Sequence, residues 1–290
     1  MPPTAIDEAI CVAGSVRVGR FRRSPDHPDF HDSGPIQSDC CFAFPRHAVV
    51  IRHSGERFVA DPNVATLYNR GQEYTREALT PCGDRSDWYG VSEDVVREAV
   101  RIYDPRAADG RRPLRWTHAP VGAHTYLAQR RLFNGLRRGT VDAMQIEETV
   151  LGIVDRVLTA AYGAERRRPP ARTRRELVTD VQCAVARRLN GEVTLQDLAA
   201  QVGVSVFHLC RTFRAVTGQT IHAYRMQLRV RSALERIERA SDLSAVALAL
   251  GFSSHSHFTA SFRRAFGVTP SGVRGTVRRT PLDTMNTRPE

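Results

Sequence analysis

One pattern of apolar residues occurs twice in the last third of the chain. Each copy has apolar residues at positions i, i+3, i+4 and i+7, then a glycine, and then a serine ahead of two apolar residues four positions apart. The first copy consists of Leu195, Leu198, Ala199, Val202, Gly203, Ser205, Leu209 and Phe213, and the second of Leu243, Val246, Ala247, Leu250, Gly251, Ser253, Ser254, Phe258 and Phe262. This spacing predicts, in each copy, two short helices joined by a turn.

The residues at the turns agree with this prediction. A glycine supplies the left-handed backbone that ends a helix, and a serine caps the next helix by accepting a hydrogen bond from its unpaired N–H groups. Two short helices with a tight glycine turn form a helix-turn-helix, whose second helix enters the major groove of DNA. We therefore expect two such motifs, over residues 194–214 and 242–264, joined by a helix over residues 221–240.

The region that contains both motifs resembles the tandem helix-turn-helix domain of AraC/XylS-type transcription regulators. The resemblance covers residues 173–276, and the residues that carry it are Thr194 to Ala199, Ser205 to Phe213, Gly251 to Ser254, Phe258, Phe262, Arg263 and Gly267 to Pro270. It implies a sequence-specific regulator, more often an activator, whose partners are double-stranded DNA and RNA polymerase. It also implies an N-terminal half that senses a signal, with a small molecule as the candidate effector, and that forms a homodimer.

The positive charge of the chain lies where DNA binding is expected. The formal net charge is +11, and residues 171–290 hold 18 Arg against 9 Asp and Glu, whereas residues 1–170 hold 24 Arg against 22. An anionic partner of the two motifs requires this asymmetry. The sequence contains no lysine, so each strongly basic contact must come from arginine, which can bind a phosphate or a guanine edge with two hydrogen bonds.

The expected fold class is α+β. Residues 39–165 are predicted to form an antiparallel sheet or small barrel with helices following, because short β-branched runs are separated by turn residues. The resemblance implies that this segment is the sensor and dimerisation domain. In order along the chain, this part resembles the cupin-like half of AraC-type regulators. The all-helical DNA-binding domain is expected over residues 173–276. The other predicted segments are a variable tail over residues 1–38, a linker over 166–172 and a second tail over 277–290.

In the second helix of each motif, the apolar stripe belongs to the core and the opposite side is expected to face DNA. The predicted DNA-binding residues are Val206, Phe207, Cys210, Arg211 and Arg214 in the first motif, and His255, Ser256, His257, Ala260 and Arg263 in the second. Arg211 is the first candidate for a base contact, because it can bind a guanine edge, and a phosphate contact is an equal alternative. Arg214 and Arg263 lie further along their helices and are expected on phosphates. Phe207 can contact a thymine methyl group or pack on the preceding helix.

Two other functions are weighed against the regulator. A metal-dependent cupin enzyme needs a His-x-His pair with a nearby Glu, and the chain has His53 and Glu56 but no His-x-His on a predicted strand. A redox sensor could use Cys40, Cys41 or Cys82, but neighbouring residues of a strand face opposite sides, so that the first two can bond to each other only with strain. We therefore predict no enzyme activity, no cofactor and no metal site.

The sequence also indicates where the protein acts. No apolar run approaches the roughly 20 residues that a membrane span needs. Residues 1–10 contain Asp7 and Glu8 and do not have the charged and then apolar order of a signal peptide. We expect a cytoplasmic protein that does not bind a membrane.

Overall fold

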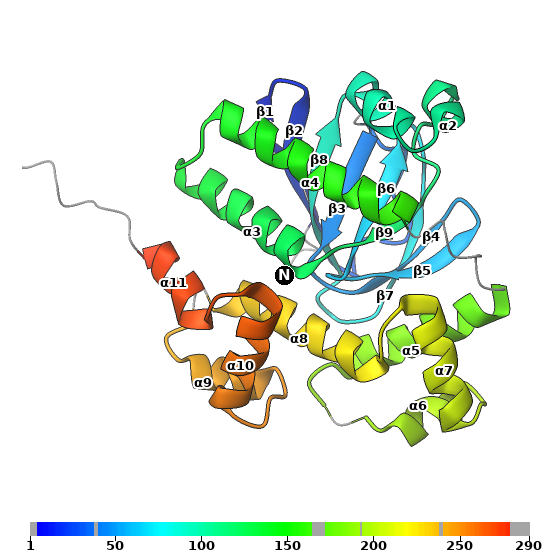
Figure 1. Ribbon diagram of the computed structural model, residues 1–290, viewed down its shortest axis with the longest axis vertical. Coiled ribbons are helices and arrows are strands. Elements are labelled where there is room, and N and C mark those ends of the chain that lie inside the picture. The colour runs from blue at the N-terminus through cyan, green and yellow to red at the C-terminus, as the bar shows by residue number, and fades with distance from the viewer. Residues whose placement is uncertain (1–4, 38–39, 164–171, 192, 238–239, 279–290) are drawn as a thin grey trace, which may run out of the picture.

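The computed structural model describes residues 5–37, 40–163, 172–191, 193–237 and 240–278. Its N-terminal part contains a six-stranded antiparallel sheet, in the order β1-β2-β8-β3-β6-β9, and a three-stranded antiparallel sheet, in the order β5-β4-β7 (Figure 1). The strands are β1 (Ala5–Ala13), β2 (Val16–Arg23), β3 (Cys40–Pro45), β4 (Val49–His53), β5 (Glu56–Ala60), β6 (Val64–Asn69), β7 (Thr75–Ala78), β8 (Asp84–Val91) and β9 (His118–Pro120).

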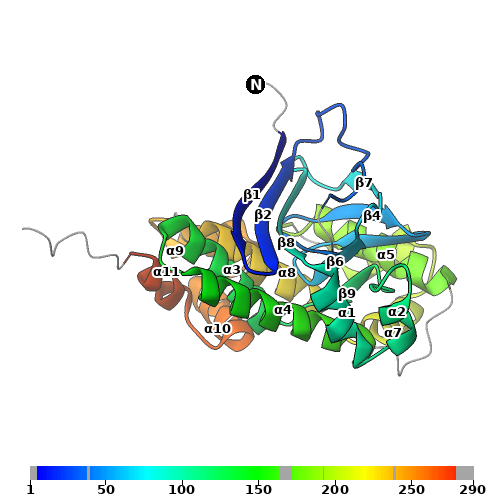
Figure 2. The same cartoon turned by 90° about the horizontal axis from the view of Figure 1, so that it is seen from above.

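Helices cover one face of the large sheet, and the small sheet lies toward the other (Figure 2). Side chains alternate along each strand, so Phe42, Phe44 and Tyr89 reach the helix-covered face and join the main core. The helices of this part are α1 (Glu93–Arg101), α2 (Pro105–Asp109), α3 (Ala123–Arg138) and α4 (Ala143–Gly163). The predicted antiparallel sheet with helices is confirmed, but the strands form two sheets and not one closed barrel.

The predicted tail over residues 1–38 is wrong for most of its length. Residues 5–13 and 16–23 form β1 and β2, and β2 pairs with β8 inside the six-stranded sheet. Val16 and Val18 are fully buried on the helix-covered face. Arg17 lies between the two valines, and Arg20, Arg22 and Arg23 follow them, so the alternation of apolar and polar residues that identifies a strand ends after Val18. The predicted linker lies outside the described residues except for its last position, which begins α5, and the predicted C-terminal tail except for 277–278, the end of α11.

The C-terminal part is helical, as predicted, and both helix-turn-helix motifs are present. In the first motif Thr194 and Asp197 form a reciprocal capping box at the start of α6, and Ser205 caps α7. In the second motif Ser254 caps α10 by accepting from the backbone N–H of His257. The helices are α5 (Arg172–Arg187), α6 (Leu195–Gln201), α7 (Val206–Thr217), α8 (Ile221–Arg236), α9 (Leu243–Ala249), α10 (His255–Phe266) and α11 (Pro270–Arg278).

The two motifs do not have equivalent cores. The first motif packs with α5 and the first half of α8 in a cluster of its own, which includes Leu209, Phe213 and Tyr224. The apolar residues of the second motif, among them Phe258 and Phe262, belong instead to the main core of the N-terminal part. Helix α10 contacts α3 as well as α8. The second motif and the N-terminal part therefore form one continuous apolar unit.

The two turn glycines provide a matched test of local packing. Gly203 and Gly251 both have positive φ, 68° and 77°. A Cβ added at Gly203 would meet nothing within 4 Å, whereas one at Gly251 would lie 2.6 Å from Arg229 Nη2 and 2.7 Å from the carbonyl oxygen of Asn190. At Gly251, therefore, both the backbone conformation and the lack of room for a side chain require glycine, whereas at Gly203 only the backbone conformation does.

We expect Gly203→Ala to lower the free energy of unfolding by about 1 kcal/mol, the cost of a left-handed alanine. Gly251→Ala should lower it by a further 1–3 kcal/mol or so, because the Arg229 guanidinium and a backbone carbonyl must also shift. Urea unfolding of the two variants and the wild type measures the difference. Equal losses in the two variants would contradict the packing argument.

Candidate nucleic-acid interface

Helix α7 has one buried side and one exposed side. Leu209 and Phe213 have no exposed surface and pack in the cluster of the first motif. The Ser205 side chain accepts from the backbone N–H of His208 at 3.2 Å, which fixes the N-terminal turn that a major groove would receive. Of the five residues predicted to face DNA on this helix, Phe207, Arg211 and Arg214 are exposed, and Val206 and Cys210 are half-buried.

Helix α10 presents a hollowed surface. The hollow is lined by His255, Ser256, Thr259, Ala260, Arg263, Arg264 and Thr269. It therefore brings together four of the residues predicted for the second motif. Thr259 was not predicted from the sequence, although it lies at i+3 from Ser256 on the same helix face as Ala260 and Arg263, at i+4 and i+7. Arg264, at i+8 on the same face of α10, was also missed, as was Thr269, which follows the end of α10 and reaches the hollow through the fold of the chain.

His257 is the predicted residue that the hollow leaves out. Its ring packs edge to face on Phe252, with the ring centres 5.5 Å apart, and Nδ1 lies 3.1 Å from Ser253 Oγ. These contacts hold the imidazole against the turn of the motif. The side chain of His257 thus supports the turn in this structure, and the hollow itself is lined by its neighbours.

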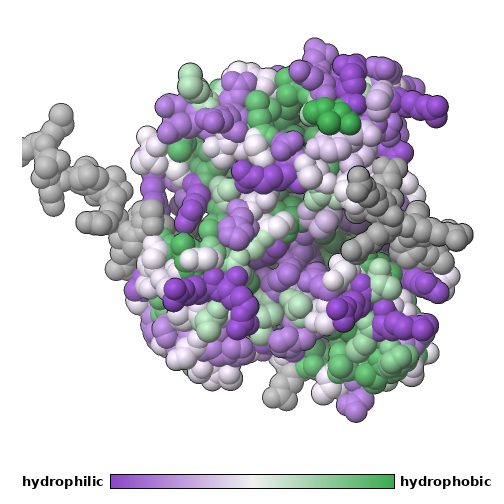
Figure 3. Space-filling model, in the orientation of Figure 1, coloured by the Kyte–Doolittle hydropathy of each residue, from purple (hydrophilic) through white to green (hydrophobic). Residues whose placement is uncertain are grey.

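The exposed surface of the first motif includes apolar side chains. Phe207 has 75% of its surface exposed and Leu195, at the start of α6, has 41%. Apolar residues gather on the surface around the first motif in the space-filling view (Figure 3). An exposed phenylalanine on the outer side of a recognition helix is available for a thymine methyl group.

Helix α8 connects the two motifs, and a set of buried polar contacts docks it on the N-terminal part. We call this set the α8 junction; it consists of Tyr224, Arg231 and Glu235 of α8 and Arg46, Asp61, Pro62, Asp87, Val121 and Arg130 of the N-terminal part. Arg231 has 2% of its surface exposed, and it donates to the carbonyl oxygens of Pro62 and Val121, the latter at 2.7 Å. Tyr224 donates its hydroxyl hydrogen to Asp61.

The far end of the α8 junction is a network of charges. Asp87 Oδ2 accepts from Arg46 and Arg130, each at 2.9 Å. The same two arginines reach Glu235 of α8, at 3.3 and 3.0 Å. Because each arginine bridges a carboxylate of the sheet to the carboxylate of α8, removing one partner would leave a buried charge uncompensated.

Burial raises the pKa of Asp61 from its ordinary value of 3.8 to about 6. The hydrogen bonds from Tyr224 and from the backbone N–H of Asn63 oppose this shift, but desolvation exceeds them. A carboxyl group with a higher pKa in the folded state stabilises the fold while it is protonated. That contribution is complete below pH 3.8 and is lost as the pH rises through about 6.

We therefore expect the free energy of unfolding of the wild type to fall relative to that of Asp61→Asn as the pH rises from about 4.5 to 7. The relative change should be about 1–3 kcal/mol, since one pKa unit corresponds to about 1.4 kcal/mol. Asparagine keeps an acceptor for Tyr224 but does not titrate. Urea unfolding at several pH values measures both profiles, and parallel profiles would refute the assignment to Asp61.

Phe207 and Leu209 provide a second matched pair, two positions apart on α7. Leu209→Ala should cost about 2–5 kcal/mol of stability because the leucine is fully buried. Phe207→Ala should change stability by less than about 0.5 kcal/mol, as exposed positions do, and yet weaken DNA binding. Urea unfolding and the fluorescence anisotropy of a labelled duplex separate the two effects. A stable Phe207→Ala variant with unchanged DNA affinity would remove this side chain from the interface.

The two residues considered for a metal enzyme, His53 and Glu56, line a hollow between the small sheet and α5. His53 and Glu56 are opposite each other on β4 and β5, with His53 Nδ1 at 3.3 Å from the carbonyl oxygen of Glu73. Glu56 accepts from Thr117 Oγ1 at 2.5 Å. Within the described ranges, no group of three or more His, Cys, Asp or Glu residues is arranged to hold a metal ion.

Cys40 belongs to the main core and Cys41 lines a cavity on the other face of the sheet, so the two thiols face opposite sides. Cys82 is exposed in the loop before β8. None of the helices in the described part of the chain has the length and apolar composition that a membrane crossing requires.

Known proteins match the region of the two motifs. A family described as "Helix-turn-helix domain" matches residues 198–276. The "HTH-type transcriptional activator RhaS" of Pectobacterium atrosepticum is 34% identical over 84 residues, which are 29% of this chain and 30% of the relative. The "HTH-type transcriptional activator RhaR" of Klebsiella pneumoniae is 34% identical over 109 residues, 36% of this chain and 38% of that protein. The chain thus spans about a third of the length of these curated relatives.

A likeness to a solved structure extends over more of the chain. The crystal structure of ToxT from Vibrio cholerae covers 92% of this chain and all of that one, with 11% sequence identity and a TM-score of 0.36. Over residues 198–276 the family match and the paired, capped motifs coincide. Residues 198–276 therefore form a helix-turn-helix domain that is similar to the DNA-binding domain of AraC-type regulators.

Proposed function

We propose that the protein is a sequence-specific transcription regulator that reads double-stranded DNA with α7 and α10. The observation that carries this proposal is the pair of capped recognition helices, each with an exposed polar side, joined by the single helix α8 in the arginine-rich part of the chain. Two recognition helices on one chain can enter neighbouring segments of the major groove, as the two subunits of a simpler dimer do.

The two sets of residues predicted from the sequence remain the proposed DNA-binding residues. Arg211 is exposed on α7 and is proposed to bind a guanine edge with its two-pronged guanidinium. Arg214 and Arg263 are proposed to bind phosphates, which adds affinity without sequence selection. Thr259 and Arg264, which share the hollow with Arg263, join the proposed interface of the second motif.

The direction of control is proposed from the relatives. RhaS and RhaR are both named transcriptional activators. We propose activation here as well, with RNA polymerase as the protein partner. A regulator with DNA as its partner acts where the DNA lies, and a cytoplasmic location follows from that role.

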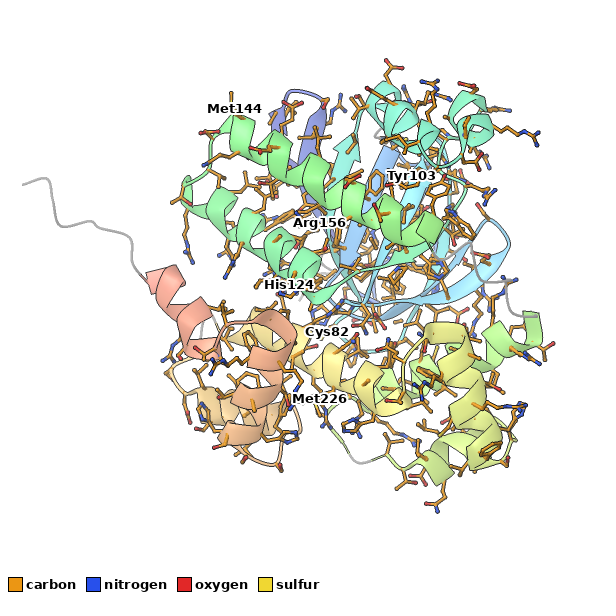
Figure 4. The ribbon with its side chains drawn as sticks, in the orientation of Figure 1. Cys82, Tyr103, His124, Met144, Arg156 and Met226 are labelled. Atoms are coloured by element: carbon orange, nitrogen blue, oxygen red, sulfur yellow. The ribbon has the colours of Figure 1, made fainter. Side chains whose placement is uncertain are left out.

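The N-terminal half is proposed to sense a signal and to form a homodimer, with the boundary between the halves at residues 166–172. Helix α4 lies on the outside of the N-terminal part, and Met144 and Arg156 are labelled on it in Figure 4. Met144 has 79% of its surface exposed. An outer helix that presents such a side chain is a candidate for the dimer contact. The α8 junction is proposed to carry the signal to both recognition helices.

Substitution of Arg211 tests the reading role of α7. A preferred duplex is first selected from a random pool with the wild type. Arg211→Ala should bind this duplex about 10- to 100-fold more weakly, the loss expected from one two-pronged base contact, and should bind unselected DNA almost as the wild type does. Fluorescence anisotropy with both duplexes measures the ratio.

Arg214→Ala is the matched control, three residues along the same exposed side. It should weaken binding to both duplexes by the same factor and reduce the slope of log affinity against log salt by about one. If Arg211→Ala behaves in the same way, Arg211 binds phosphate. If the wild type selects no preferred duplex, the proposed function itself fails.

A further inference from the structure

The two sheets and the loop between β2 and β3 line an open cavity of about 290 Å³. It lies on the face of the large sheet that the helices do not cover, and its far wall includes Val49 and Ile51 of β4 and Ala60 of β5. The volume is near the lower limit of small-molecule sites in proteins, about 300 Å³. A ligand of this cavity would therefore be small.

The strands build the cavity through their alternation. Large side chains such as Phe42, Phe44 and Tyr89 fill the helix-covered face. On the opposite face, Ala43, which lies between Phe42 and Phe44, and Ser86 of β8 are small and line the cavity. Larger side chains at these two positions would fill the cavity, so the small residues keep it open.

Trp88 forms part of the floor of the cavity. It pairs with Gly19 across β2 and β8, and a Cβ at Gly19 would lie 2.1 Å from Trp88 Cζ2. The glycine therefore allows the indole to lie against the backbone of β2. Asp7 accepts a hydrogen bond from the Trp88 side chain, and this carboxyl lines the cavity as well.

The buried charge in the cavity wall is a carboxylate. Asp84 has 3% of its surface exposed, and burial raises its pKa. It accepts from Ser86 Oγ at 3.1 Å, and Arg76 Nη1 lies 3.4 Å from its other oxygen. A carboxylate has about four acceptor positions, so Asp84 can accept further hydrogen bonds from a ligand.

The buried guanidinium group nearest Asp84 belongs to Arg76 and is paired with that carboxylate. Arg76 is not among the cavity-lining residues; its guanidinium lies over the rings of Phe21 and Tyr74, at 4.7 and 4.8 Å, and donates to the Tyr74 hydroxyl at 3.2 Å. Arg17, which does line the cavity, is exposed. The lining residues thus combine two carboxyl groups with one arginine open to solvent.

Aromatic faces complete the wall. Tyr68 and Tyr74 are stacked with their ring centres 4.8 Å apart, and both line the cavity with Phe21 and Trp88. Aromatic faces and carboxylates are the two groups that proteins use to bind ammonium ions in partly dry surroundings.

The cavity also adjoins the α8 junction at three positions. Pro45, Ala60 and Ser86 line the cavity. The residue after each of them is a junction residue: Arg46 contacts Glu235, Asp61 accepts from Tyr224, and Asp87 accepts from Arg46. A ligand that displaces these strands would therefore move groups that hold α8.

We propose that this cavity binds a small organic cation, an ammonium group on an apolar or aromatic body, and that its occupancy is read by α8. Asp84 and Asp7 bind the ammonium group, and Trp88, Tyr68 and Tyr74 cover the rest of the ligand. The second half of the proposal rests on the proposed function, because it makes the cation the effector of DNA binding.

Three probes with the same phenylethyl-type body and different charge test the proposal: phenethylamine, 2-phenylethanol and phenylacetate. Isothermal titration calorimetry of the full chain at pH 7.5 should give phenethylamine a Kd at least tenfold lower than that of phenylacetate, with the alcohol between them. Ala43→Leu, which extends a side chain into the cavity, should abolish binding of all three. Tighter binding of phenylacetate, or amine binding that Ala43→Leu leaves unchanged, would overturn the proposal, as would the absence of amine binding.

Two carboxyl variants test the charge recognition. Asp84→Asn should lose at least tenfold of the preference for the amine over the alcohol. Because Asp84 also lies beside the buried Arg76, Asp7→Asn, at the exposed edge of the sheet, is the second variant, with Asp94→Asn on α1 as a matched charge control outside the cavity. A preference that survives in both cavity variants would contradict the inference.

The fluorescence anisotropy of a labelled duplex, measured with the wild type and with Ala43→Leu, distinguishes a failure of the cation site from a failure of the proposed function. Phenethylamine should change the DNA affinity of the wild type and not that of Ala43→Leu. Amine binding in a protein that does not bind DNA would reject the proposed function and leave the site in place. DNA binding without amine binding would reject the site alone.

Discussion

The burial of Arg231 against two backbone carbonyls determines how the halves of this protein are related. A guanidinium with 2% of its surface exposed can be tolerated because the carbonyls of Pro62 and Val121 accept from it and the ring of Tyr126 lies 5.4 Å from its centre. Burial lowers the pKa of Arg231 to about 10, so the side chain still carries its charge at neutral pH. Helix α8, which connects the two motifs, is therefore held on the N-terminal part by hydrogen bonds that would all be lost if the helix moved away.

The two helix-turn-helix motifs pack differently against the rest of the protein. The first has a core of its own, closed by α5, and touches the small sheet through a minor cluster that includes Val50, Val59 and Cys183. The second has no separate core, because its phenylalanines continue into the apolar interior beneath α3. A change in the N-terminal part would thus reach α10 through direct packing and α7 through α8 and the ion pair of Arg57 with Asp180.

Local chemistry made the helical domain predictable from the sequence. Gly203, Gly251, Ser205 and Ser254 each act within a few residues of their own position, and the structure has the turns and caps that they predict. Helical phase likewise separated the buried side of each recognition helix from the exposed one. The same phase would have included Thr259, while the position of His257 depends on a ring contact that no spacing reveals.

The N-terminal part was less predictable because its decisive contacts join distant residues. Arg231 meets Pro62, and Tyr224 meets Asp61, across more than 160 positions of the sequence. Arginine side chains are mostly exposed in proteins, so the sequence does not predict that Arg231 of α8 is buried. The strand β2 was missed because four of its eight residues are arginines, and Val16 and Val18 are its buried apolar residues.

The continuous interior beneath α3 and α10 restricts how such a chain can be recombined. A chimera that took its second motif from a relative would need side chains at Phe258, Phe262 and Phe266 that fit this particular N-terminal part. The first motif, closed by its own α5, could be exchanged with fewer compensating changes.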